Sequence, residues 1–341
     1  VLDVGVRPKD PDAEEMWLNP DYMEDPELFE KLRQTMAELK KRGRQVWIYD
    51  EVGYPSASAA GKVLEGHPEY GVWALGCRTL YPKEGAISVE IGDKLLESCL
   101  ALPLHQGIAS LENGIDLTDR ASSGSFTWTV PEGDWIICLY ERYHPDTWKR
   151  HNARRRNVNI MDRDAIARFI EITHERYAKE LGPQLQDVEL FFTDEPQFGV
   201  TEPWIYGKEK ADPAVQWCDE LPSAFEAKKG YSIQKAIPAL FYDVGPETSR
   251  YRYDFYDVQS DLVAENYFGQ LQDWCHEHGV WSSGHMLLEE SLLHHLMWTG
   301  SFMKNWSRMD LPGVDLLLAD PSKVDPEMAK QSLPGDDPRY K

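Results

Sequence analysis

The chain has 341 residues, 42% of them hydrophobic, which is enough for one large domain or two ordinary ones. Its 36 basic and 58 acidic residues give a formal net charge of −22, so neither nucleic acid nor an anionic membrane surface is expected as a partner. No apolar run is long enough for membrane insertion. The five cysteines are scattered without CxxC spacing and predict neither a zinc site nor a disulfide framework.

The N-terminal part contains a well-marked helix followed by a short strand. Asp25 is placed to cap the helix and Pro26 suits its first turn, while apolar residues recur behind them at helical spacing. Val46 to Tyr49 are then expected to form a strand that ends in Asp50 and Glu51. A loop rich in small residues follows this strand.

Residues 65–145 show no helical stripe and are expected to form a separate, inserted β-rich subdomain. Within them, AISVEIG (86–92), SFTWTVPEG (125–133) and DWIICLYERY (134–143) are typical of strands that alternate or pair through turns. A small antiparallel β insert is expected, because these segments alternate or pair through turns and no helical stripe interrupts them.

The rest of the chain alternates short apolar strands with amphipathic helices. The expected strands are NVNIMD (157–162), VELFFTDEP (188–196), VWSSGH (280–285) and Val314 to Leu318, and a long helix is expected from Tyr253 to His278. Asp162 is expected to cap a helix that Gly182 ends. This alternation predicts an α/β domain with a parallel sheet, made of residues 1–64 and 146–341.

Acidic residues stand at the ends of several of these strands. They are Asp50, Glu51, Asp162, Asp194, Glu195, Glu289 and Glu290. In a (β/α)8 barrel all strand ends meet at one rim, where the active sites of that fold lie. A doubly wound sheet usually carries a glycine-rich phosphate loop, and neither GxGxxG nor GxxxxGK occurs. We therefore expect an α/β fold of the (β/α)8 TIM-like barrel type, with a small antiparallel β insert.

A ring of carboxylates with aromatic neighbours points to glycoside hydrolysis. That reaction needs one protonated acid at the leaving oxygen and a second carboxylate as base or nucleophile. Glu195 is the candidate acid, because burial and neighbouring negative charge keep a carboxyl protonated. Asp194 alternates to the other side of the strand and is expected to be a structural or hydrogen-bonding partner.

Two further positions are open to both a catalytic and a structural interpretation. Glu289 and Glu290 are candidates for the second carboxylate, although one of them can simply open the helix that follows. His285 lies in an otherwise apolar strand and needs a partner, which is either a core hydrogen bond or a substrate. Candidate aromatic residues for the lining of a sugar site are Trp47, Trp204 and Trp298.

Several motifs taken together resemble glycoside hydrolase family 106, the α-L-rhamnosidase-type enzymes. WIYDEVGYPSASAAGKV (47–63) resembles the family's segment of YDE, then P-S-G, then A-G-G. FFTDEP (191–196) and SSGHMLLEE (282–290) fall where the family has later acidic strand ends, and FTWTVPEGDW (126–135) resembles its inserted β segment. The resemblance covers roughly residues 1–320. It implies a (β/α)8 catalytic domain, hydrolysis of terminal rhamnosides, Ca²⁺ and inversion of configuration.

The chain also departs from the family pattern. P-S-G reads Pro55-Ser56-Ala57 and A-G-G reads Ala60-Gly61-Lys62, which reduces the backbone freedom of this loop. About six barrel strands are recognisable, and the segment after Asp320 is too polar and proline-rich to supply two more. The barrel in this chain is therefore expected to be incomplete or to close differently. The resemblance favours a secreted or periplasmic location, although the chain carries no signal peptide.

The leading hypothesis is a glycosidase that cleaves terminal α-L-rhamnosides, with Glu195 as acid and Glu290 or Glu289 as base or metal ligand. The residues expected to bind the sugar are Asp50, Glu51, Asp194, His285, Trp47 and Trp298. No organic cofactor is expected, and the expected ion is Ca²⁺ held by oxygens of the rim. The same rim could serve a galactoside or a glucuronide, because fold does not fix specificity. The alternative from a different class is a carbohydrate-binding protein without activity.

Overall fold

The computed structural model describes residues 21–145, 157–198, 214–287, 289, 295–296 and 298–315. The chain divides into two compact units, which are described one at a time. Unit 1 is Val1–Val72, Asp146–Gly199 and Gln259–Lys323, and unit 2 is Trp73–Pro145, Val200–Val258 and Val324–Lys341. The domain boundaries expected from the sequence, at residues 65 and 145, stay a prediction.

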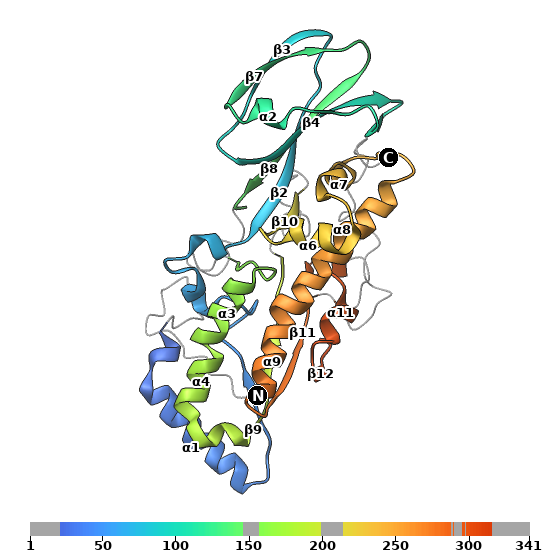
Figure 1. Cartoon of the computed structure of the whole chain (residues 1–341). Helices are drawn as coiled ribbons and strands as arrows, with labels where there is room; N and C mark the ends of the chain where they lie inside the picture. The colour runs from blue at the N-terminus through green and yellow to red at the C-terminus, as the bar shows by residue number, and fades with distance from the viewer. Residues whose placement is uncertain are drawn as a thin grey trace. The chain divides into compact units, whose positions relative to one another are not determined.

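The centre of unit 1 is a four-stranded parallel sheet (Figure 1). Its order is β1 (Val46–Tyr49), β9 (Val188–Asp194), β11 (Trp281–His285) and β12 (Leu311–Pro312). Tyr49 pairs with Phe192, and His285 pairs with Asp194. Because the strands are parallel, their carboxyl ends meet at one edge of the sheet, and this register sets the strand-end side chains next to one another.

Aromatic side chains join the sheet of unit 1 to its helices. These helices are α1 (Pro26–Lys41), α3 (Arg163–Ile172), α4 (His174–Leu181) and α9 (Gln270–Glu277). The Phe191 ring on β9 lies 4.9 Å from that of His174, 5.7 Å from Tyr177 and 5.3 Å from Trp274. Phe29 of α1 reaches the same group through Tyr177, at 5.8 Å. The inner strand is therefore fixed by rings from α1, α4 and α9, and its position does not depend on the loops at its end.

The helix starts expected from the sequence are confirmed. The Asp25 carboxylate accepts hydrogen bonds from the amides of Glu27 and Leu28 at the start of α1. Asp162 does the same for α3, with the amides of Asp164 and Ala165. Each cap satisfies backbone donors that have no partner within the helix.

The long helix expected from Tyr253 to His278 is observed as three consecutive segments. They are α8 (Thr248–Val263), the π-helix η6 (Ala264–Gly269) and α9. The chain turns after them at Gly279, whose φ is +70°. A π turn adds one residue to the helical repeat and rotates the face that follows it.

One expected strand was wrong, and the described start of a second one is not a strand. Residues 157–162 make only one isolated bridge, between Val158 and Gly71, because the Asn159 side chain accepts a hydrogen bond from the Met161 amide and bends the chain toward α3. In the described part of the chain the last strand is β12, and Val314, where the expected run begins, is 53% exposed and outside any strand. Residues 316–318 lie outside the described part of the chain.

Unit 2 is built on an antiparallel sheet. Its order is β10 (Ala214–Trp217), β2 (Trp73–Leu80), β8 (Trp135–Tyr143), β4 (Leu95–His105) and β5 (Ile108–Ala109), with β6 (Ile115–Asp116) also on β4. A separate two-stranded antiparallel sheet pairs β3 (Gly85–Glu90) with β7 (Ser125–Val130). The three segments that the sequence predicted as strands correspond to β3, β7 and β8, which confirms antiparallel β structure here. Their apolar residues, with Trp128, Trp135 and Ile137 at the centre, make a buried core.

Short helices complete the two units. They are η1 (Tyr22–Glu24), η2 (Ala59–Leu64), η3 (Pro68–Tyr70), α2 (Thr118–Ala121), η4 (Gly182–Asp187), α6 (Leu221–Lys229), η5 (Ile233–Lys235), α7 (Ile237–Phe241) and α11 (Phe302–Trp306). The mixed α/β fold is confirmed, whereas a complete (β/α)8 barrel is not shown. In the described ranges, no helix has both the length and the apolar character needed to cross a membrane.

Candidate active site

The carboxyl ends of β9 and β11 bring together Asp194, Glu195, His285 and Glu289, which we call the carboxylate cluster. Ligand atoms of the first three lie within 4.8 Å of one another. His285 bridges two acids, with Nε2 2.5 Å from Asp194 Oδ1 and Nδ1 3.1 Å from Glu289 Oε1. The parallel register of β9 and β11 is the cause, because it pairs His285 directly with Asp194.

Glu195 occupies the first position after β9 and is only 8% exposed. Burial and the nearby Asp194 carboxylate raise the pKa of Glu195 to about 7. Its backbone is also unusual, with a φ of +48°, and its amide donates to the His285 carbonyl at 3.2 Å. Glu195 is therefore a buried carboxyl that is still partly protonated near neutral pH.

His285 is the cation of the cluster. Burial alone would lower the pKa of His285, but its hydrogen bonds to Asp194 and Glu289 raise that pKa to about 10. The ring thus carries a positive charge at neutral pH and balances part of the surrounding negative charge. Of the two interpretations left open by the sequence, the structure supplies a hydrogen-bonding role, while contact with a substrate stays a prediction.

Asp194 is held by donors from two strands. Besides His285, the Tyr49 hydroxyl at the end of β1 donates to Asp194 Oδ2. The Tyr49 ring stacks on Phe192 with 6.1 Å between the ring centres, which fixes the direction of the hydroxyl. Sequence reasoning missed Tyr49, although its place directly before an acidic strand end is a usable signal.

Glu289 is buried and has one oxygen engaged. Its Oε1 accepts a hydrogen bond from the Met286 amide at 2.7 Å and lies next to His285, whereas Oε2 is buried without a partner among the described residues. A buried carboxylate oxygen without a donor is expensive and is often a functional group. Glu290, the other candidate, lies outside the described residues.

Glu51 is buried and binds the loop that follows β1. Its carboxylate accepts from the Ser58 amide at 2.8 Å, from the Ser58 hydroxyl at 3.1 Å and from the Ala60 amide at 3.1 Å. The loop needs such support because Ala57 and Ala60 have φ values of +107° and +56°. Ala57 is the residue at which the chain departs from the family's glycine, so the reduced backbone freedom expected there coincides with a strained conformation.

Asp50 is also buried, at 1% exposure. Its Oδ1 accepts from the Ser56 hydroxyl at 2.7 Å, and burial together with the Glu51 charge raises the pKa of Asp50 well above its ordinary value. The sugar-binding roles expected for Asp50 and Glu51 stay predictions, and the structure gives both residues bonds to their own loop.

The structure describes two of the three tryptophans expected to line the site. The Trp47 indole donates to Glu189 at 2.7 Å, and Glu189 lies five positions before Asp194 on β9, toward the opposite end of the sheet. Trp298 is 1% exposed, and its carbonyl accepts from the Phe198 amide at 2.8 Å. Their contact with a sugar stays a prediction, and Trp204 lies outside the described residues.

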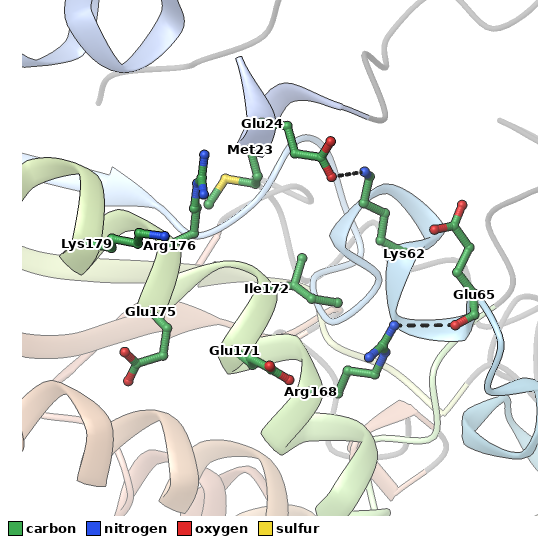
Figure 2. Close-up of a pocket in the computed structure, with 10 residues that line it drawn as sticks. All are labelled: Met23, Glu24, Lys62, Glu65, Arg168, Glu171, Ile172, Glu175, Arg176 and Lys179. Carbon is green, nitrogen blue, oxygen red and sulfur yellow. Dashed lines mark hydrogen bonds and ion pairs between the residues drawn. The ribbon is translucent and has the colours of Figure 1, made fainter. Parts of the chain in front are cut away.

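A cavity of about 500 Å³ opens elsewhere in unit 1, between η1, η2, α3 and α4 (Figure 2). Its lining residues are Met23, Glu24, Lys62, Glu65, Arg168, Glu171, Ile172, Glu175, Arg176 and Lys179. Lys62 pairs with Glu24 at 2.7 Å, and Arg168 donates to the Glu65 carbonyl at 3.3 Å. None of the residues of the carboxylate cluster lines it, so the cavity is not the candidate active site.

Two known proteins are similar to this chain. A solved rhamnosidase from Novosphingobium sp. PP1Y has a similar fold, with a TM-score of 0.55 over 89% of this chain and 44% of that chain, at 13% identity. A putative beta-glucuronidase from Formosa agariphila is 25% identical over 204 residues, which are 57% of this chain and 16% of that protein. The chain thus spans less than half the length of either protein.

The family itself is shown by sequence. The family model for glycoside hydrolase family 106, described as alpha-L-rhamnosidase, matches residues 101–332, which is more than half of the chain. The chain belongs to glycoside hydrolase family 106, and the resemblance recognised in the strand-end motifs is confirmed.

Proposed function

We propose that the protein is a glycosidase that cleaves terminal α-L-rhamnosides, with Glu195 as the general acid. The observation that carries the proposal is the state of Glu195 at the end of β9. The side chain is buried beside Asp194, and its pKa is raised to about 7, so it holds a proton that it can donate near neutral pH. Family membership supplies the reaction type.

The cluster can supply the remaining charges of the reaction. As Glu195 protonates the leaving oxygen, positive charge develops on the sugar ring, and the negative charge of Asp194 favours it. Glu289 is the proposed base, because its Oε2 has no partner among the described residues and can accept a proton from water. Inversion requires the two carboxyl groups to be about 6.5–9.5 Å apart, which leaves room for that water.

A neutral sugar suits this cluster better than a charged one. A glucuronide carries a carboxylate that would meet Asp194, Glu195 and Glu289, and the cation His285 is already bonded to two of these acids. A rhamnoside carries a methyl group at the corresponding position and meets no such repulsion. The name of the Formosa relative supports the glucuronide alternative only weakly.

The residues of the cluster do not by themselves fit Ca²⁺. Calcium takes six to eight oxygen ligands, whereas this group contributes the nitrogen of a protonated His285 that is hydrogen-bonded to Asp194. A cation next to an imidazolium is also repelled. We therefore derive no step through a metal, and Ca²⁺ stays a prediction for other oxygens of the rim.

Release of 4-nitrophenol from a panel of aryl glycosides tests the proposal, with and without chelator. We expect cleavage of the α-L-rhamnoside, its loss in Glu195→Gln, and its retention in the control Glu171→Gln, which changes an exposed acid on α3. Near wild-type turnover in Glu195→Gln would sink the assignment of the acid. Saccharide binding without hydrolysis of any glycoside would favour the carbohydrate-binding alternative.

A further inference from the structure

One residue of the loop after β1 bonds both backbone groups of Asp194. The Ser56 amide donates to the Asp194 carbonyl at 2.7 Å, and the Asp194 amide donates to Ser56 Oγ at 2.9 Å. Ser56 thus continues the pairing of β1 with β9 beyond the last regular bond, in which the Asp50 amide donates to the Phe192 carbonyl at 2.9 Å. The contact ends immediately before Glu195.

Asp50 fixes the orientation of the Ser56 hydroxyl. Ser56 Oγ donates to Asp50 Oδ1 at 2.7 Å. A hydroxyl has a single hydrogen, so this bond turns the lone pairs of Oγ toward the Asp194 amide. Ser56 is 3% exposed and Asp50 is 1% exposed, so water does not compete for either bond. The buried Asp50 carboxyl thereby has a structural task in its own loop.

The backbone of Glu195 requires support of this kind. A φ of +48° is unfavourable for a residue with a Cβ, and such a conformation persists only where its surroundings fix it. On one side the Glu195 amide donates to the His285 carbonyl of β11 at 3.2 Å. On the other side Ser56 holds the preceding peptide. One contact comes from β11 and the other from the loop after β1, so together they determine the direction in which the Glu195 side chain leaves β9.

We propose that Ser56, oriented by Asp50, is a positioning residue that holds the Asp194–Glu195 turn and so aims the Glu195 carboxyl into the cluster. The contacts by which Ser56 holds the turn rest on the geometry alone. Its value for catalysis rests on the proposed function, which gives Glu195 the role of acid. Ser56 touches neither the sugar nor the reacting atoms in this scheme.

Amide hydrogen exchange tests the bracing in this chain. We expect Ser56→Ala to raise the exchange rate of the Asp194 amide about tenfold, because the amide loses its acceptor. The matched control is Ser58→Ala, which removes a buried hydroxyl from the same loop that donates to Glu51, and it should leave that rate within about twofold. An unchanged rate in a folded Ser56→Ala protein overturns the proposal.

If Ser56→Ala fails to fold, amide exchange in the wild type tests whether the Asp194–Glu195 turn is held. The amides of Asp194 and Glu195 should then be protected to a similar extent as those of Leu190 and Phe191 in the body of β9. Rapid exchange at Asp194 and Glu195 alone would show that the turn is not held, and it would overturn the proposal.

Carboxyl titration by ¹³C NMR separates this proposal from the proposed function. We expect the Glu195 midpoint near 7 in the wild type and in Ser56→Thr, which keeps the hydroxyl, and a midpoint moved toward 4.5 in Ser56→Ala. A midpoint that stays at the wild-type value in Ser56→Ala overturns the positioning role. A wild-type midpoint near 4.5 instead removes Glu195 as the acid, and the exchange rates then still decide whether Ser56 braces the turn.

Discussion

Buried carboxylates are treated in opposite ways in the two units. In unit 2, Glu141 is 4% exposed, and the Arg78 guanidinium donates to both of its oxygens, at 2.9 Å and 3.4 Å for the nearest contacts. Asp254 lies close to Lys229, and although burial opposes it, hydrogen bonds from Lys229 and Tyr231 lower the pKa of Asp254. Each of these acids is paired with a permanently charged base, and the half-buried Asp254 shares Lys229 with Asp257.

In unit 1 several acids share one weaker base. Within the described part of the chain, the ion pairs of Asp194 and Glu289 are both made with His285. Glu195 next to them is left with a raised pKa. An acid paired with Arg or Lys stays ionised and contributes only to stability. Acids crowded around one histidine raise the pKa of one of their number, which can then donate a proton near neutral pH. The difference separates acids that pair with Arg or Lys from the acids for which we propose a catalytic role.

The largest effect is expected for Glu289, the proposed catalytic base. Glu289→Gln should lower kcat on an aryl α-L-rhamnoside by about 10²–10⁴-fold, because the proposed base can no longer take a proton from water. Glu141→Gln, the structural counterpart in unit 2, should keep its turnover. Steady-state kinetics of both variants checks this. Equal losses in the two would mean that pairing with a base does not distinguish the two kinds of acid.

The pH dependence of stability is the next effect. Because the folded-state pKa of Glu195 is raised from 4.5 to about 7, its contribution to stability is complete below pH 4.5 and is lost as the pH rises through 7. The free energy of unfolding of the wild type should therefore fall by about 2–3 kcal/mol across this interval, relative to Glu195→Gln. Urea denaturation at a series of pH values measures it, and parallel curves for the two proteins would contradict it.

A smaller loss is expected when a structural acid loses its charge. Glu141→Gln should lower the free energy of unfolding by about 1–2 kcal/mol, since Arg78 keeps part of its exposure to water and is not left fully buried. Glu90→Gln is the control, because Arg78 bonds its carbonyl and not its exposed side chain. Urea denaturation of both variants measures the difference. Equal stability of the two variants would contradict the claim that pairing with Arg78 makes Glu141 stabilising.

The smallest effect concerns the loop that Glu51 supports. Ala57→Gly should raise the free energy of unfolding by about 0.5–1 kcal/mol, because relief of the positive φ outweighs the greater freedom of glycine in the unfolded chain. Ala165→Gly, within the regular helix α3, should lower it by about 1 kcal/mol. Thermal denaturation compares the two, and a loss of stability in both would show that the loop is not strained at Ala57.

Local signals in the sequence predicted local structure well. The caps at Asp25 and Asp162 were read directly, since a cap depends on a few neighbouring residues. The strand at 157–162 failed because Asn159 offers the backbone a turn, which competes with pairing that only the tertiary fold could supply. The barrel depends on how many strands assemble, and four parallel strands of unit 1 are what the described residues show.

The sequence predicted individual residues of the candidate site at the strand ends, but not the contacts between them. Glu195 and His285 were found because polar residues in apolar strands are expensive. Their partnership was not found, because it depends on the register of β9 against β11, which the sequence does not encode locally. Ser56 was missed for the same reason: its partner Asp194 lies far along the chain.

The left-handed backbone of Glu195 also bears on the evolution of this chain. Asparagine or glycine adopts a φ of +48° more easily than glutamate does, so a change of Glu195 to either would relieve strain and burial while removing the carboxyl. Instability would not purge such a change from a population. If Glu195 is the acid, as proposed, a lineage released from selection for hydrolysis would therefore drift easily toward a well-folded protein without it.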